Sequence, residues 1–221
     1  MLVLCLARAA LGDAALSVLV DRIQSCYDKA QTFSAQFDQE YRAKAFPRPE
    51  KRHGKFWFKK PGKLLFQYQG SDPEDEKYFI SDGAEFWMYE PAMAQATVTP
   101  FQPSQLSAAV RFLMGSARLQ DEFEISLVGR EGNAVKLLLK PRKTEEHLVD
   151  LVFMIDEPTA AVLETHITDA AGNTNSFRFQ KPVLNRDYSD EKFRFVPPAG
   201  VRVVRPDTMD AAGSAKGNGG R

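Results

Sequence analysis

The chain has 221 residues and a formal net charge of zero, from 29 basic and 29 acidic side chains. Its length allows one domain with a substantial core, and its balanced charge gives no reason to expect nucleic acid or an anionic membrane surface as a partner. Sixteen Phe against two Trp and six Tyr indicate a large apolar core or a lipid pocket, because Phe adds apolar area without a polar group.

The N-terminal segment 1–13 is apolar and rich in small residues. We interpret it as a remnant signal peptide or an N-terminal extension; the alternative is that it lengthens the first helix. Over 14–29, apolar residues recur at helical spacing, which predicts an amphipathic helix. No apolar run reaches the ~20 residues that span a bilayer, and Cys5 with Cys26 predicts no disulfide framework.

Strands dominate the pattern from residue 33 onward. Alternating apolar residues predict a strand over 33–41, and two prolines with a group of basic residues predict a loop over 45–54. Three aromatic strands follow within 54–89, and Asp82-Gly83 predicts a hairpin turn there.

A short helix is predicted after one further strand, QATVT. Ser104 is placed to cap this helix and Gly115 to end it. The second half of the chain then consists almost entirely of short β patterns separated by turn signals.

These elements predict a mainly β (α+β) fold. We expect about ten or eleven antiparallel strands with two or three helices in one domain over 14–206, because such a series forms a strongly curved sheet or a barrel. The segment 207–221 contains nothing that can be buried and is predicted to be a disordered tail.

The aromatic strands place apolar side chains at consecutive positions, although strand side chains alternate between two faces. Either both faces are therefore covered, or one face holds an apolar ligand. Composition alone favours a core filled by side chains. A curved sheet with helices across it can instead enclose an unfilled space, which would be a ligand site.

No pattern of residues predicts catalysis. His53, His147 and His166 have no metal-ligand partner at helical or strand spacing, and phosphate-binding loops and GxSxG are absent. The acidic cluster at 72–76 is expected to be a solvated turn. We therefore predict a protein that is not an enzyme and has no metal or cofactor.

Several motifs follow one another within about 14–204. They are Phe33-Ser34-Ala35-Gln36-Phe37-Asp38-Gln39, Gly54-Lys55-Phe56-Trp57-Phe58-Lys59-Lys60-Pro61-Gly62-Lys63, Ser81-Asp82-Gly83 leading to Phe86-Trp87-Met88-Tyr89-Glu90-Pro91, Gly172-Asn173 with Phe177-Arg178-Phe179, and Phe193-Arg194-Phe195 before Pro197-Pro198-Ala199-Gly200. In this order they resemble the motifs of the periplasmic lipoprotein carrier family, the LolA-type chaperones.

This resemblance implies an incomplete antiparallel β-barrel whose apolar concave face is closed by a lid of helices. It also implies a monomeric periplasmic carrier that shelters lipoprotein acyl chains and moves lipoproteins from an inner-membrane ABC-type release complex to an acceptor at the outer membrane. A protein of the same fold could instead bind another lipid or a glycolipid, or could sense lipoproteins as an interaction module.

Strand parity and the resemblance together suggest the residues of the site. The expected cavity residues are Phe37, Phe56, Phe58, Leu64, Phe66, Tyr68, Phe79, Trp87, Tyr89 and Phe153. The expected lid residues are Leu16, Leu19, Val20, Ile23, Leu106, Val110, Leu113 and Met114. Lys60 stands where the family has an arginine, which implies that it lies inside and holds the lid by hydrogen bonds to helix carbonyls.

Overall fold

The computed structural model describes residues 2–70, 75–143 and 148–206. Its strands are β1 (Thr32–Arg42), β2 (Glu50–Lys59), β3 (Lys63–Gln69), β4 (Lys77–Asp82), β5 (Glu85–Glu90), β6 (Gln95–Pro100), β7 (Phe123–Glu131), β8 (Ala134–Pro141), β9 (Asp150–Asp156), β10 (Ala161–Thr168), β11 (Thr174–Leu184) and β12 (Arg202–Val204). The predicted tail, 207–221, and His147 lie outside the described residues.

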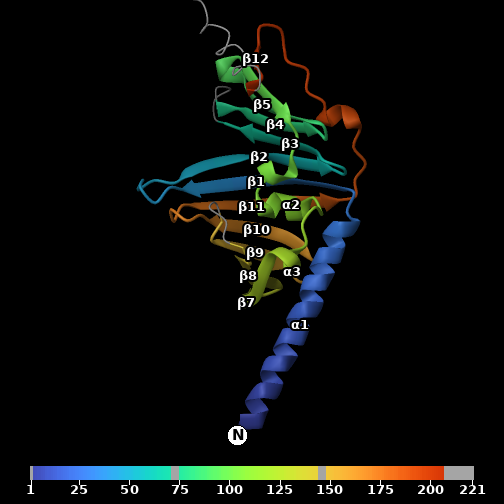
Figure 1. The fold of residues 1–221 in the computed structure, drawn as a ribbon, viewed down its shortest axis with the longest axis vertical. Coiled ribbons are helices and arrows are strands. Elements are labelled where there is room, and N and C mark those ends of the chain that lie inside the picture. The colour runs from blue at the N-terminus through green and yellow to red at the C-terminus, as the bar shows by residue number, and fades with distance from the viewer. Residues whose placement is uncertain (1, 71–74, 144–147, 207–221) are drawn as a thin grey trace, which may run out of the picture.

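All twelve strands belong to one sheet, in the order β12-β6-β5-β4-β3-β2-β1-β11-β10-β9-β8-β7. Every neighbouring pair is antiparallel except β12 with β6, which is parallel. Because β12 and β7 form the two ends of this order, the sheet is an incomplete barrel, as predicted, with slightly more strands than expected (Figure 1).

The α-helices lie on one side of this sheet (Figure 1). They are α1 (Leu2–Lys29), α2 (Ala108–Leu113) and α3 (Leu119–Glu122). The 3-10 turns are η2 (Pro91–Met93), η3 (Pro103–Gln105) and η4 (Asp190–Phe193), and η4 lies on the opposite face, where Asp190 pairs with Lys59 and Lys63. In the structure residues 2–13 continue the helix that was predicted over 14–29. None of the helices in the described ranges has the length and apolar character of a membrane span.

In place of the single helix predicted after Pro103, the structure has the 3-10 turn η3 followed by the helix α2. The predicted N-cap residue, Ser104, is wrong. Ser107, not Ser104, is the N-cap of α2, and its Oγ accepts a hydrogen bond from the N–H of Val110 at 3.4 Å. The predicted end is confirmed, since Gly115 has a φ of 64° that few other residues adopt.

The predicted loop over 45–54 is also shorter than expected. Glu50 begins β2, and Glu50–His53 pair with β1, for example Arg52 opposite Gln39. This part of the hairpin extends past the core, so both of its faces carry polar side chains and the apolar alternation that marks a strand is missing.

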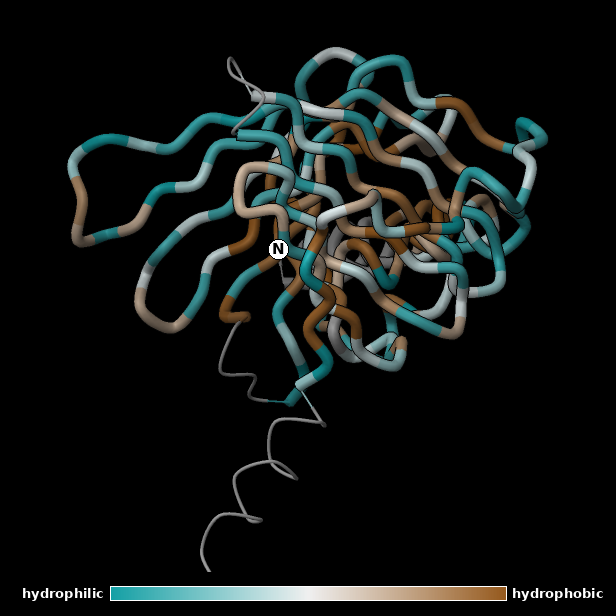
Figure 2. Tube along the Cα trace, turned by 90° about the horizontal axis from the view of Figure 1, so that it is seen from above, coloured by the Kyte–Doolittle hydropathy of each residue, from teal (hydrophilic) through white to brown (hydrophobic). Residues whose placement is uncertain are grey.

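Apolar clusters lie on both faces of the aromatic strands, which accounts for their consecutive apolar residues. The larger cluster joins the sheet to α1 and α2. The smaller one, on the opposite face of β4, β5 and β6, contains Ile80, Trp87, Ala96 and Val98 and is covered by Phe195 of the C-terminal segment. In Figure 2 the apolar residues concentrate in the interior, and polar residues outline the outer loops.

Candidate functional site

The face of the sheet that the helices cover is lined by aromatic residues in register. Phe56 on β2 pairs with Phe66 on β3, which pairs with Phe79 on β4, which pairs with Met88 on β5. The rings of Phe56 and Phe66 stack with centroids 4.1 Å apart. Alternation in four adjacent strands thus builds one continuous apolar surface.

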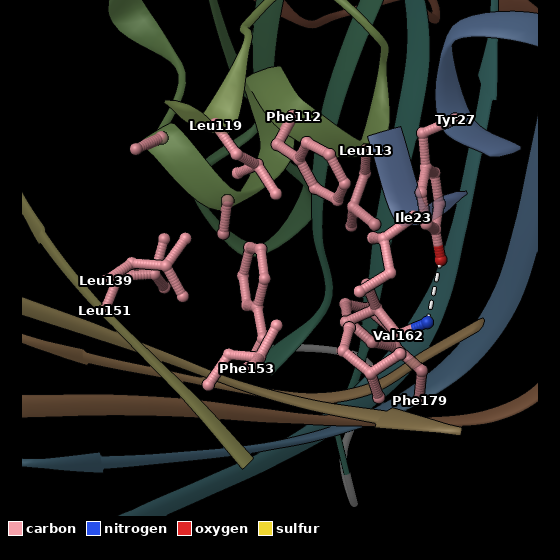
Figure 3. Packing of buried hydrophobic residues seen from close by; sticks show 14 of the residues in the cluster. Ile23, Tyr27, Phe112, Leu113, Leu119, Leu139, Leu151, Phe153, Val162 and Phe179 are labelled. Atoms are coloured by element: carbon pink, nitrogen blue, oxygen red, sulfur yellow. Dashed lines mark hydrogen bonds between the residues drawn. The ribbon is translucent and has the colours of Figure 1, made fainter. Parts of the chain in front are cut away.

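The helices α1, α2 and α3, called the helical lid below, close over part of this surface. Tyr27 of α1 contacts Phe112 of α2 with ring centroids 4.9 Å apart, and Phe112 contacts Phe153 of β9 at 5.4 Å. Figure 3 shows Phe112 and Leu113 facing Phe153 and Val162 across the interface. Side chains of the lid and the sheet therefore interlock.

All eight expected lid residues belong to the larger apolar cluster or pack against it. Five are buried in the larger apolar cluster, and three are half-buried against it. The buried ones are Leu19, Val20, Ile23, Leu113 and Met114, and the half-buried ones are Leu16, Leu106 and Val110. Whether they touch lipid stays a prediction.

Polar side chains, among them those of Lys60, Tyr27 and Gln24, fasten α1 to the rest of the chain. Lys60 Nζ donates to the backbone oxygens of Tyr27 and Asp28, both at 2.9 Å, so it holds the last turn of the helix. The Tyr27 hydroxyl accepts from the N–H of Val162 at 2.8 Å, and burial raises the pKa of Tyr27. Gln24 ties α1 to α3 and to the segment before it: its Oε1 accepts from the N–H of Leu119, the first residue of α3, at 3.0 Å, and its Nε2 donates to the Ala117 oxygen at 3.2 Å.

The aromatic surface is not covered evenly. Phe37, Phe56, Phe58 and Leu64 are almost fully buried, whereas a strip further along the same face stays half-buried. We call this the aromatic strip; it consists of Phe66, Tyr68, Phe79, Phe86 and Met88. Desolvation raises the pKa of Tyr68 in this strip to about 12. The strip is a part of the apolar face that stays partly exposed while the lid is closed.

The sequence left open whether side chains or empty space lie beneath the helices. Phe33, Phe58 and Phe112 are fully buried at this interface, and Phe33 stacks on Phe58 with ring centroids 5.9 Å apart. The closed lid therefore rests on packed side chains. A long apolar ligand can enter this region only if the lid moves.

The assignment of Trp87 and Tyr89 to the apolar cavity is wrong. Both side chains lie on the opposite face of β5, where their rings pack against Phe195 at 5.3 and 5.1 Å. The register explains this, since Trp87 pairs with Ile80 and both lie on the face opposite Phe79. Phe86 and Met88 occupy the inner positions instead. The Asp82-Gly83 hairpin could have revealed this, because a tight turn fixes the register across it.

The remaining expected cavity residues all lie on the lid-covered side. Phe153 is fully buried under α2, and Phe66, Tyr68 and Phe79 belong to the aromatic strip. Phe33, Phe112 and Phe179 join the same cluster, although none of them was among the expected cavity residues. Gln24 and Tyr27 were also missed as polar ties, because nothing in a helical stripe reveals a distant hydrogen-bond partner.

Comparison with known proteins adds to this geometry. A family model described as "Outer membrane lipoprotein carrier protein LolA" matches residues 28–196. An outer-membrane lipoprotein carrier protein from Nitrosomonas europaea is 26% identical over 186 residues, which cover 84% of this chain and 88% of the relative. One from Pseudomonas aeruginosa is 28% identical over 198 residues, covering 89% and 92%. Among solved structures, an uncharacterized conserved protein from Thermus thermophilus is similar in fold, with a TM-score of 0.55 at 11% identity, covering 86% of this chain and 99% of that one.

Proposed function

The chain belongs to the outer membrane lipoprotein carrier (LolA) family, and we propose from this premise that it shelters the acyl chains of lipoproteins between its helical lid and its sheet. The observation that carries the proposal is the lid-covered aromatic face, which is apolar from β2 to β5 and remains reachable at the aromatic strip. The work is binding and transfer, without a catalytic step.

Physical chemistry sets the need for such a carrier. Each methylene group withdrawn from water contributes about 0.8 kcal/mol, so leaving several long acyl chains in water costs on the order of tens of kcal/mol. Apolar burial is non-directional, and a surface of Phe and Leu can hold chains of differing length and then release them. Polar anchors in the site would make release harder.

The lid must open for a whole acyl chain to enter. Phe66 and Phe79 of the strip are half-buried and offer a first contact, and chains that extend under the lid replace the contacts that Phe112 and Leu113 make with the sheet. The Lys60 contact to the end of α1 then acts as a latch whose loss accompanies opening. Lid closure without cargo protects the apolar face from water.

We infer a route for this transfer by analogy with the family. The chain would act in the periplasm as a monomer, with 1–13 removed on export and 14–206 as the working domain. It would receive lipoproteins from an inner-membrane ABC-type release complex and deliver them to an acceptor at the outer membrane. The release complex supplies the energy for extracting cargo from the bilayer.

A transfer assay tests this proposal. Inner-membrane vesicles that contain the release complex and a triacylated lipoprotein are incubated with the purified chain, and the soluble fraction is analysed by size exclusion and mass spectrometry. A one-to-one complex of chain and lipoprotein is expected. Recovery of only a free lipid or a glycolipid would replace lipoproteins with that ligand, and no soluble complex at all would refute the carrier role.

A matched pair of variants tests the aromatic strip. Phe79→Gln removes a ring that contacts Tyr68 at 5.8 Å and Phe86 at 6.2 Å in the strip. Tyr78→Gln changes the neighbouring residue, which faces the other side of the sheet against Tyr89. We expect Phe79→Gln to lower the yield of the complex several-fold and Tyr78→Gln to leave it near wild type. Equal effects of the two would remove the strip from the binding site.

A further inference from the structure

The β1–β2 hairpin projects farther from the core than its neighbours (Figure 1). At its tip Phe46 is 71% exposed, more than any other large apolar side chain among the described residues. Its N–H donates to the oxygen of Ala43 at 3.0 Å, which closes a turn, and Pro47 follows directly. An ordered turn thus presents an aromatic side chain to solvent.

Charge is concentrated on the same segment. Residues 42–52, called the hairpin tip below, contain five cations and one acid, although the whole chain is neutral. The cations are Arg42, Lys44, Arg48, Lys51 and Arg52. The balanced total charge, which gave no reason to expect an anionic surface as a partner, therefore conceals a local excess of positive charge.

Nearby acids offset only part of this excess. Arg42 pairs with Glu40 at 2.6 Å and Arg52 with Glu50 at 3.1 Å, while Lys51 lies 3.7 Å from Glu40. These pairs are exposed, and exposed pairs hold their partners weakly. Lys44 and Arg48 flank Phe46 and are exposed as well. The tip therefore combines an aromatic group with cations that can exchange partners.

The adjacent turn between β10 and β11 braces the tip. Lys44 N–H donates to the Asn173 side-chain oxygen at 2.9 Å, and Asn173 is itself held by Asp169 at 2.8 Å. A hollow of about 340 Å³ lies beside Phe46, lined by Tyr41, Ala43, Pro47, Arg48 and Glu50. Because these contacts already hold the hairpin tip in place, the tip loses little conformational entropy when it binds a partner.

We propose that the hairpin tip docks the protein on an anionic lipid surface. Phe46 enters the interfacial layer, where an aromatic side chain is favoured, and the cations meet lipid phosphates. One Phe or a few cations alone bind a bilayer weakly, but together they give reversible docking. This proposal goes beyond the carriage of acyl chains, because it concerns where the protein is bound while it takes up or releases its cargo.

Vesicle flotation tests the proposal with the full chain. Vesicles of phosphatidylcholine with 30% phosphatidylglycerol are compared with phosphatidylcholine vesicles, at low and at 0.5 M salt. We expect binding to the anionic vesicles that falls on adding salt, because exposed charges are screened. Phe46→Ser should weaken binding about tenfold, and Arg48→Gln with Lys51→Gln should weaken it at least as much.

Matched controls separate the tip from general effects. Met93→Ser removes another apolar side chain, 68% exposed on η2. Lys136→Gln with Lys140→Gln removes two exposed cations from β8. Both controls should bind as wild type does. The proposal rests on the difference in vesicle binding between the tip variants and these controls.

Tryptophan fluorescence measures directly how deeply the hairpin tip enters the bilayer. The fluorescence of Phe46→Trp should shift to the blue on anionic vesicles and be quenched by brominated lipid, and that of Met93→Trp should not. Docking on lipid is refuted if the tip variants float with anionic vesicles as much as wild type does. It is also refuted if the fluorescence of Phe46→Trp neither shifts nor is quenched on these vesicles. Loss of binding to the release complex in detergent, without any vesicle binding, would assign the tip to a protein partner. Cargo retention in solution is measured separately, so failure of the docking proposal leaves the carrier function untouched.

Discussion

Lys60 carries its ammonium into a partly desolvated position at the end of α1. Burial lowers its pKa, and the nearby Asp28 only partly opposes this effect. The carbonyls of Tyr27 and Asp28 that it contacts belong to the last turn of the helix, where partial negative charge accumulates. A lysine can thus donate to both carbonyls, although it lacks the planar fork of arginine.

Replacing Lys60 tests this latch. Lys60→Met removes two charged hydrogen bonds and should lower the free energy of unfolding by about 1–2 kcal/mol, as the site is partly exposed. It should also increase the fluorescence of an apolar dye, because the lid opens more often. Lys55→Met gives the same loss of charge on the opposite face of β2 and is the control. Equal dye binding by both variants would argue against the latch.

Gly115 shows how closely the latch is packed. An added Cβ there would lie 2.5 Å from Lys60 Nζ and 3.0 Å from the Tyr27 oxygen. Gly132 has a similar φ of 56°, but a Cβ there would meet nothing within 4 Å.

The two glycines therefore make a matched pair. Gly132→Ala should cost about 1 kcal/mol through backbone strain alone. Gly115→Ala should cost about 1 kcal/mol more and should raise dye uptake, because it displaces Lys60. Thermal unfolding and dye titration measure both effects. An identical cost at both positions would mean that Lys60 adapts freely.

At the scale of elements, the C-terminal segment is fastened to the opposite face of the sheet. Asp190 of η4 binds Lys59 at 2.9 Å and Lys63 at 2.6 Å, and Lys192 lies 4.0 Å above the Trp57 ring. These contacts explain how a segment with little regular structure covers the smaller apolar cluster. The hydrogen bonds from Lys59 and Lys63 lower the pKa of Asp190 to about 2.

This shift predicts a pH dependence. The pKa of Asp190 is lower in the folded chain than the ~3.9 of an unfolded one, so its stabilising contribution is complete above about pH 4 and is lost as pH falls through about 2. Wild type should be more stable than Asp190→Asn at pH 5 to 7, and the two should converge near pH 2. Urea denaturation across this range measures the difference. Glu191→Gln, a neighbouring exposed carboxylate, is the control and should show no such convergence.

At the scale of the whole molecule, the lid and the sheet differ in how they are attached. The strand β1 is hydrogen-bonded to β2 on one side and β11 on the other. By contrast, α1 and α2 hold to the sheet through side chains and a few polar ties. Segments attached in this way open locally at a lower free energy than the sheet does.

Hydrogen exchange tests this difference. Amides in the last turns of α1 and in α2 should exchange through local openings that depend little on urea. Amides of β1 should exchange only on global unfolding, with a strong dependence on urea. In Lys60→Met the amides of the lid should exchange faster than in wild type. The exchange rates of the β1 amides should change only as much as the global free energy of unfolding changes. Lid amides that exchange only with the whole molecule would refute an independently moving lid.

The strand pattern was readable from the sequence because alternation and turn residues act locally. The sequence identified the aromatic strands, the Asp82-Gly83 turn and the end of α2 at Gly115. It misplaced Trp87 and Tyr89, because a strand that is apolar on both faces does not reveal which face is inner. Charged residues hid the start of β2. How far side chains such as Phe112 fill the space below the lid depends on three-dimensional packing, which no spacing records.

Lys59 and Lys60 are consecutive residues that hold different segments to the sheet. Lys59 binds Asp190 of the C-terminal segment on one side, and Lys60 binds the end of α1 on the other. A shift by one residue exchanges the sides of every following group in a strand. Deleting or inserting a single residue between Gly54 and Pro61 would therefore undo both attachments at once. We therefore expect this segment to tolerate no insertion or deletion, even at positions where individual residues can be substituted.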